Sequence, residues 1–178
     1  INSLFTDCSN FNGSVKYWNI SNALSLNNMF SSCQYFNNGH SNGILNNMHW
    51  DNNYNNILST SEMFKGCNNF NAQLTTFFPT ADHLLTADSM FMGCNAMNAP
   101  INIVANNLTS TRNMFNGCNK FNNTINIGDL AKVKSTERMF MDCSALETIS
   151  QLIINNTTEE PSWNTKKVTT MCEMFRGC

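Results

Sequence analysis

The stretch Met174-Phe175-Arg176-Gly177-Cys178 (MFRGC) is the last of seven copies of the motif Met/Leu-Phe-x-x-Cys in this 178-residue chain. Successive motif cysteines are 25, 34, 27, 24, 25 and 35 residues apart, so the unit is about 25 residues long with two longer copies. The motif residues are Cys8, Cys33, Cys67, Cys94, Cys118, Cys143 and Cys178, with Phe5, Phe30, Phe64, Phe91, Phe115, Phe140 and Phe175. Such a period is typical of stacked repeat proteins, because one short unit cannot bury its own apolar face.

A second constant begins three residues after each cysteine, where an apolar residue is followed by asparagine in the first five copies. These asparagines are Asn12, Asn37, Asn71, Asn98 and Asn122. The sixth copy has Leu146-Glu147 instead. We interpret the asparagines as structural, because a repeated side-chain amide can satisfy backbone groups of the adjoining turn.

Apolar spacing predicts the local structure of each repeat. In the last copy the apolar residues recur at helical intervals, which predicts a short amphipathic helix that carries the motif. They are Val168, Met171, Met174, Phe175 and Cys178. The alternation at residues 101–103 and 125–127, both Ile-Asn-Ile, predicts a short strand after each motif. The fold class is therefore predicted to be an α/β repeat, a solenoid of about seven turns with one short helix and one short strand in each.

Residues 1–178 are predicted to form a single array. Its Met, Phe and Cys side chains would form internal columns, and the two longer copies would place their extra residues in loops at 37–43 and 155–162. Because the chain starts at Ile1 without Met and stops inside a repeat, we interpret it as a fragment of a longer repeat protein.

Composition argues against two classes of partner. Only 12% of the residues are charged and the formal net charge is -2, so the chain lacks the basic field that captures nucleic acids. No apolar run approaches the length of a membrane span. Polarity comes instead from about thirty-three asparagines, a residue type that tolerates left-handed turns.

The order of Met-Phe-x-Gly-Cys, Phe-Asn, a strand and then a Trp-Asn/Asp segment resembles the BspA-like leucine-rich repeats. The Trp segment is complete at residues 18–21 and partial at Trp50 and Trp163. That family occurs in surface proteins of bacteria, mycoplasmas and protists and in some large DNA viruses. The resemblance implies a right-handed solenoid of the leucine-rich-repeat type, displayed on a surface, often for adhesion and without enzymatic activity.

The cysteines have two interpretations. A column on a strand layer would place neighbouring thiols about 4.8 Å apart, within reach of a disulfide, whereas a column on a helix layer would be too widely spaced. The alternative is a column of small buried thiols that fill the core. No Cys-x-x-Cys pair is present, so a zinc site is not expected.

One stretch resembles a calcium loop. Asp51, Asn53, Asn55, Ser59 and Glu62 place oxygen ligands at the spacing of an EF-hand, although Asn56 replaces the usual glycine and no helix precedes the loop. The alternative is a solvated loop. We therefore expect no cofactor or metal, with calcium at these five residues as the exception to test.

Catalysis is not expected, because His40, His49 and His83 have no nucleophile, phosphate-loop or metalloprotease motif around them. Trp18, Trp50 and Trp163 would stack on sugars if they shared a face, but an aromatic residue at a repeat position is more often part of the core.

The sequence thus predicts a non-enzymatic, adhesin-like surface or structural protein that contacts other proteins or glycans through its solenoid faces, at the cell surface or outside the cell. One alternative is a structural component of a virion or other extracellular assembly, with self-assembly or neighbouring structural proteins as partners. A calcium- or carbohydrate-binding module is the other.

Overall fold

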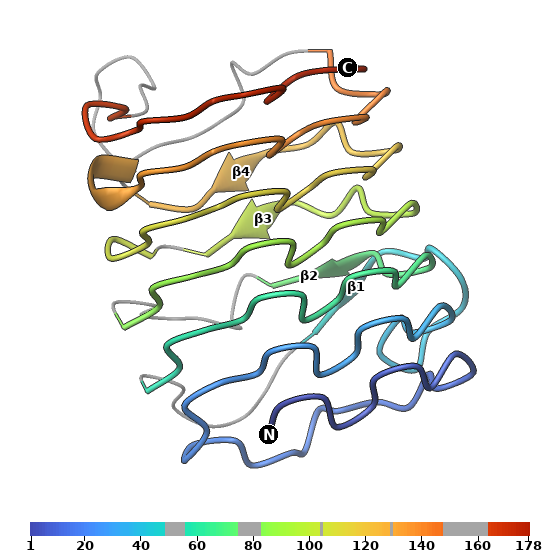
Figure 1. Cartoon of the computed structure of the whole chain (residues 1–178). Helices are drawn as coiled ribbons and strands as arrows, with labels where there is room; N and C mark the ends of the chain where they lie inside the picture. The colour runs from blue at the N-terminus through green and yellow to red at the C-terminus, as the bar shows by residue number, and fades with distance from the viewer. Residues whose placement is uncertain (49–55, 75–82, 104, 129, 148–163) are drawn as a thin grey trace.

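The computed structural model describes residues 1–48, 56–74, 83–103, 105–128, 130–147 and 164–178. The chain runs back and forth in similar layers, one for each repeat, and the two termini lie at opposite ends of the stack (Figure 1). The regular elements of the described residues are short: β1 (Asn46–Asn47), β2 (Ala72–Gln73), β3 (Ile101–Asn102), β4 (Ile125–Asn126) and the 3-10 helix η1 (Leu130–Lys132). β1 pairs with β2 and β3 pairs with β4, both in parallel.

The Met-Phe-x-x-Cys segments form a parallel backbone ladder in which alternate N–H groups of one repeat donate to the next repeat. The Phe30 N–H donates to the Met63 carbonyl at 2.9 Å, and the Phe64 N–H donates to the Met90 carbonyl at 2.9 Å. Parallel bridges at the head of these segments join Ser25 to Ser59, Ser59 to Thr86, Thr86 to Ser110, Ser110 to Ser135 and Ser135 to Thr170.

The predicted helix is therefore wrong, and with it the α/β solenoid of the leucine-rich-repeat type. No α-helix occurs in the described ranges, including the last copy at residues 168–178. Two small parallel sheets and the ladder of turns take its place.

Backbone dihedral angles explain why a helix does not form. The remaining N–H groups close turns within a segment, as when the Cys67 N–H donates to the Phe64 carbonyl at 3.0 Å. Two residues of that segment, Glu62 and Gly66, have φ angles of +57° and +71°. A right-handed helix needs negative φ at every residue. Consecutive turns with a left-handed residue every four positions produce the same apolar spacing without a helix.

The predicted strands at residues 101–103 and 125–127 are confirmed, because these segments contain β3 and β4. The Ile101 N–H donates to the Thr124 carbonyl at 2.9 Å and the Ile103 N–H to the Asn126 carbonyl at 2.7 Å. Alternation buries the isoleucines and turns Asn102 outward.

The core consists of stacked side-chain columns. Phe30 and Phe64 stack with ring centroids 5.7 Å apart and 4° between their planes. The same arrangement continues along Phe5, Phe30, Phe64, Phe91, Phe115, Phe140 and Phe175. Each fully buried Phe contributes about 1.5–3 kcal/mol of transfer free energy, which is realised only when a neighbouring layer covers it. The core thus fixes the register of the layers and the positions of their surface residues.

Candidate interaction surface

The motif cysteines lie in one column, and their thiols donate hydrogen bonds to the preceding repeat. The Cys94 thiol donates to the Phe64 carbonyl at 3.0 Å and the Cys118 thiol donates to the Phe91 carbonyl at 3.1 Å. Further pairs are Cys33–Phe5, Cys67–Phe30, Cys143–Phe115 and Cys178–Phe140. All eight cysteines are free thiols in this structure.

Burial makes the column a poor source of thiolate. Desolvation raises the pKa of Cys33 and of Cys143 to about 12, and it raises the pKa values of Cys67, Cys94 and Cys118 well above the usual range. A nucleophilic or metal-binding cysteine needs the opposite shift. The geometry therefore supports a structural role for the column.

The repeated asparagines form a second column that satisfies backbone groups. The Asn71 side chain accepts from the Asn98 N–H at 2.9 Å and donates to the Gly43 carbonyl at 2.8 Å. The same side-chain-to-N–H step joins Asn12 to Asn37, Asn37 to Asn71, Asn98 to Asn122 and Asn122 to Glu147. Glu147 thus receives the ladder bond through its backbone, even though its side chain departs from the pattern.

The other predicted site residues are only partly within the described structure. Trp18 is partly buried, and its ring stacks on Phe5 with centroids 5.4 Å apart. Trp50 and Trp163 lie outside the described residues. So do three members of the predicted calcium loop, Asp51, Asn53 and Asn55.

The two described members of that loop have other partners in the ladder. The Ser59 hydroxyl donates to the side-chain oxygen of Asn27 at 2.5 Å, and the Glu62 carboxylate pairs with Lys65 at 2.8 Å. Calcium binding there stays a prediction.

A row of side chains, one from each of repeats two to seven, lies directly before the bridging Ser or Thr. Its members are Leu24, Leu58, Leu85, Thr109, Lys134 and Thr169, and we call it the leucine–lysine row. The Leu58 N–H donates to the Leu24 carbonyl at 2.8 Å and the Leu85 N–H donates to the Leu58 carbonyl at 2.9 Å. Because paired backbones lie about 4.8 Å apart, these side chains form a continuous line.

The leucine half of the row is exposed. Leu24, Leu58 and Leu85 are 61%, 41% and 43% exposed, although the residue before each of them is buried. Single exposed leucines are common, but three in register make a contiguous apolar strip. The sequence carries a signal for it: an apolar pair precedes the bridging Ser or Thr in each of these three repeats, and only its first member points inward.

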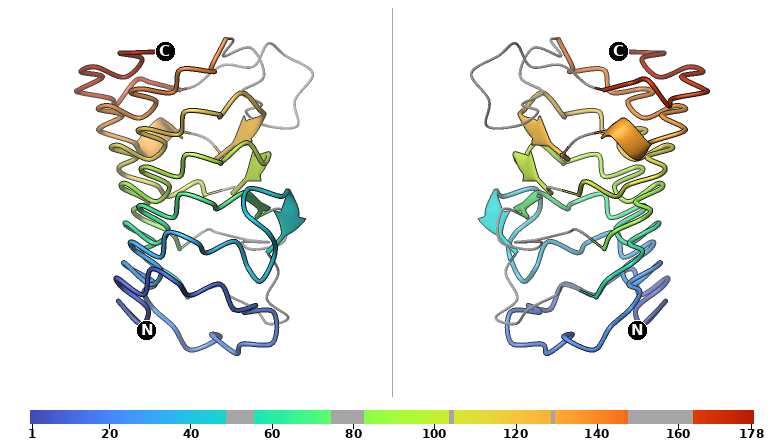
Figure 2. Two further views of the ribbon diagram at one scale, coloured as in Figure 1. Left: turned by 90° about the vertical axis from the view of Figure 1, so that its right-hand side faces the viewer. Right: turned by 90° about the vertical axis from the view of Figure 1, so that its left-hand side faces the viewer.

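The other half of the row contains one lysine between two threonines, and further lysines flank it in the sequence. Lys134 belongs to the row, and Lys132, Lys166 and Lys167 lie close to it in the chain, all of them exposed. The Lys132 amine donates to the Asn107 side chain. Across the described ranges no carboxylate forms an ion pair with these four lysines, since the ion pairs join Lys65, Arg112, Arg138 and Arg176 to Glu62, Glu137 and Glu173. The turn containing η1, just before Lys134, marks this edge of the molecule on the left of Figure 1 and in the right-hand view of Figure 2.

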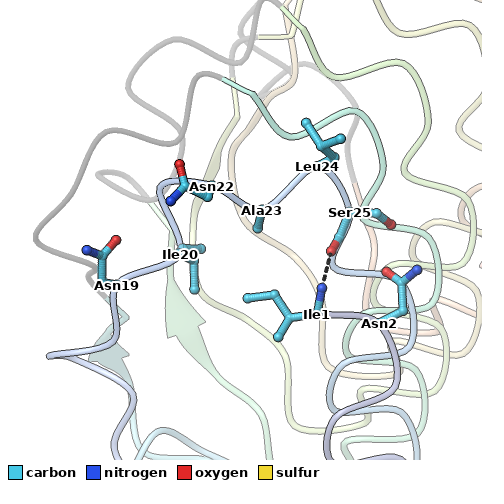
Figure 3. Close-up of a pocket in the computed structure, with 8 residues that line it drawn as sticks. All are labelled: Ile1, Asn2, Asn19, Ile20, Asn22, Ala23, Leu24 and Ser25. Carbon is cyan, nitrogen blue, oxygen red and sulfur yellow. Dashed lines mark hydrogen bonds between the residues drawn. The ribbon is translucent and has the colours of Figure 1, made fainter.

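A hollow of about 610 Å³ adjoins the first member of the row. Figure 3 shows Ile1, Ile20, Ala23 and Leu24 around it, with Asn2, Asn19, Asn22 and Ser25 as the other lining residues. The amino group of Ile1 donates to the Ser25 carbonyl at 3.3 Å. Leu24 is thus the member of the row that lines this hollow, beside the first residues of the chain.

Over the described part of the chain, no three His, Cys, Asp or Glu side chains converge as a metal site requires. The same residues contain no helix with the length and apolar character needed to cross a bilayer.

Comparison with known proteins gives a family. The model of the family described as "Mycoplasma protein of unknown function, DUF285" matches residues 1–103, 42–152 and 149–178, which together span the chain. No curated protein and no solved structure matches this chain. Overlapping matches to one model agree with the repeats seen in sequence and structure. The chain belongs to the DUF285 family of mycoplasma proteins.

Proposed function

We propose that this chain is a non-enzymatic repeat scaffold that binds other proteins through its outer surface. The observation that carries the proposal is the in-register strip of Leu24, Leu58 and Leu85, exposed on a hydrogen-bonded backbone. A backbone that is already ordered loses little conformational entropy when a partner covers its apolar side chains. Repeat proteins commonly bind through such extended surfaces.

Two observations favour binding over catalysis. The repeated thiols of the cysteine column are buried and have raised pKa values, so they supply little thiolate. The described histidines, His40 and His83, are exposed residues of different repeats.

Protein is favoured over glycan as the partner. Trp18 is the one tryptophan among the described residues, and its ring stacks on Phe5, which covers part of its surface. Sugar binding needs an open aromatic face. The exposed leucines suit a protein surface instead.

The resemblance to BspA-like repeats supports a place at the cell surface or outside the cell, with an adhesin-like role. The alternative location is a virion or another extracellular assembly. Labelling intact source cells with a membrane-impermeant maleimide tests the location, because Cys8 and Cys172 are exposed. We expect labelling before lysis. Labelling only after lysis would contradict a surface location, and sedimentation of the chain with intact particles would favour the assembly.

Photo-crosslinking tests the binding function itself. The photoreactive residue p-benzoylphenylalanine is placed at Leu58 and, as a matched control, at Lys120, which is exposed near the cysteine column. In source cells we expect a discrete adduct from position 58 that excess unlabelled chain competes away. Identical adducts at both positions, or none at position 58, would count against the row as the binding surface.

A further inference from the structure

The backbone N–H and carbonyl groups of the inner members of the leucine–lysine row are already paired within the ladder, so they cannot bind an added strand. The Leu58 N–H and carbonyl are both used, toward Leu24 and Leu85, and the Lys134 N–H and carbonyl are used toward Thr109 and Thr169. Strand addition recruits free main-chain groups at a sheet edge. A partner that lies along the row must therefore be recognised by its side chains.

The spacing of the row suits an α-helix. From Leu24 to Leu85 is two ladder steps, or about 9.6 Å. On a helix, residues i and i+7 are about 10.5 Å apart along the axis. On an extended strand, same-face residues are about 6.7 and 13.4 Å apart, so neither interval fits. A helix with apolar residues at i, i+4 and i+7 can thus place one side chain near each leucine.

Charge sets the direction of that helix. Lys134 lies two ladder steps beyond Leu85, about 19 Å from Leu24, which corresponds to residues i+11 to i+14 of the helix. Carboxylates at those positions would meet lysines that no carboxylate neutralises in the described structure. The negative end of a helix dipole is its C-terminus, so the C-terminal end lies over Lys134.

We propose that the leucine–lysine row binds an amphipathic α-helix of a partner protein. Apolar residues at i, i+4 and i+7 cover Leu24, Leu58 and Leu85, and acidic residues one to two turns later face Lys134 and Lys132. This inference rests on the proposed protein-binding function and adds the chemistry of the partner.

A designed peptide tests the proposal directly. It is a fluorescein-labelled helical peptide with leucines at i, i+4 and i+7 and glutamates at i+11 and i+14. The control peptide has the same composition with the leucines distributed around the helix. Fluorescence anisotropy with the whole chain should show saturable binding of the first peptide, at least about tenfold tighter than the control.

Variants of the chain locate the binding site. Leu58→Asp should weaken peptide binding by about tenfold or more, because it puts a charge in the apolar contact. Lys134→Glu should weaken it by a similar factor at low salt and less at high salt. A peptide with lysine at i+14 should recover affinity for Lys134→Glu, and Lys120→Glu should change nothing. Leu58→Ser serves as a second variant if Leu58→Asp lowers the melting temperature.

Several results would overturn the inference. They are equal binding of the two peptides, no saturation up to about 1 mM, and insensitivity to Leu58→Asp. Binding to phosphatidylglycerol vesicles through Leu58 and Lys134, without peptide binding, would assign the row to a membrane surface. Self-association that Leu58→Asp abolishes and the peptide does not compete would assign it to a second copy.

The protein-binding function and the helical nature of the partner can be contradicted separately. If the position-58 adduct forms in source cells and the designed peptide does not bind, the partner is not such a helix but the binding function stands. If neither occurs, the binding function fails as well.

Discussion

The thiol of Cys118 donates a hydrogen bond to the backbone carbonyl of Phe91, one repeat earlier, with 3.1 Å between sulfur and oxygen. The same carbonyl accepts the N–H of Cys94 at 3.0 Å. Each carbonyl of this kind thus has two donors inside the core, one from its own repeat and one from the next. The cysteine column is a set of links between layers, in addition to filling space.

Removing one link should lower stability measurably. We expect Cys118→Ala to reduce the free energy of unfolding by about 1–2 kcal/mol, because a buried hydrogen bond is lost and a small cavity forms. The exposed Cys172 provides the control, and Cys172→Ala should change the free energy of unfolding by less than about 0.5 kcal/mol. Equilibrium unfolding in urea measures both values. Equal losses would show that the column contributes nothing specific.

The same burial predicts loss of stability in alkali. Cys33 and Cys143 have folded-state pKa values of about 12, above those of thiols in an unfolded chain. Folding stability is therefore intact below about pH 8.5 and falls as the pH rises toward 12, because only the unfolded chain releases these protons. Each buried thiol adds about 1.4 kcal/mol per pH unit to that slope.

Melting temperatures between pH 8 and 11 measure this effect. The melting temperature of the Cys118→Ala variant should fall less steeply with pH than that of the unchanged chain. The melting temperature of Cys172→Ala should fall as steeply as that of the unchanged chain. A profile that is flat above pH 9 would contradict the raised pKa values.

Thiol reactivity should separate the cysteines into two groups. Near neutral pH we expect iodoacetamide to modify Cys8 and Cys172 in the folded chain and to leave Cys67, Cys94 and Cys118 unmodified until urea unfolds it. Peptide mapping by mass spectrometry reads out each site. Modification of Cys94 at the rate of Cys172 would mean that the layers open readily.

The sequence predicts the period, the columns and the strands, but not the ladder of turns. Met63, Phe64 and Cys67 recur at spacings that a helix and a series of turns share, so apolar periodicity alone does not distinguish the two. The residue before the motif cysteine does distinguish a helix from a series of turns. It is glycine in Gly66, Gly93, Gly117 and Gly177, and glycine is unfavourable inside a helix but suited to positive φ.

The leucine–lysine row does not follow from the sequence for a different reason. Leu24 and Leu58 look like core residues by type, and only the three-dimensional ladder shows that each follows a buried residue and points outward. The lysine end of the row is not evident from residue type, because Lys134 takes the place of leucine in a later repeat. Aligning the repeats on the bridging Ser or Thr, in place of the cysteine, would have revealed the row.

The asparagine column should be sensitive to loss of its amide. Asn71 is 9% exposed, and its side chain both accepts from Asn98 and donates to Gly43. We expect Asn71→Ala to cost about 1–3 kcal/mol, because it leaves backbone groups unpaired. Asn71→Asp keeps the acceptor but loses the donor, so it should also destabilise the chain, and more at neutral than at acidic pH. Asn95→Ala, at an exposed position, is the control, and an equal effect there would contradict the structural role.

Two glycines with positive φ should respond differently to alanine. Gly93 has a φ of +73°, and a Cβ atom there would meet nothing closer than 3.8 Å. Non-glycine residues occupy the same position in other repeats, as Ser32 does with a φ of +63°. Gly93→Ala should therefore cost only about 1 kcal/mol, the strain of a left-handed residue.

Gly128 offers no such tolerance. Its φ is +82°, and a Cβ atom would lie 2.9 Å from the backbone nitrogen of Ala105. That nitrogen donates to the Ile127 carbonyl at 3.3 Å, so the clash is relieved only by disturbing a bond between layers. We expect Gly128→Ala to lower the free energy of unfolding by at least about 2–3 kcal/mol. Urea unfolding measures the free energy of unfolding of Gly93→Ala and Gly128→Ala. Equal losses would mean that strain in φ, and not the approach of neighbouring layers, sets the loss of stability.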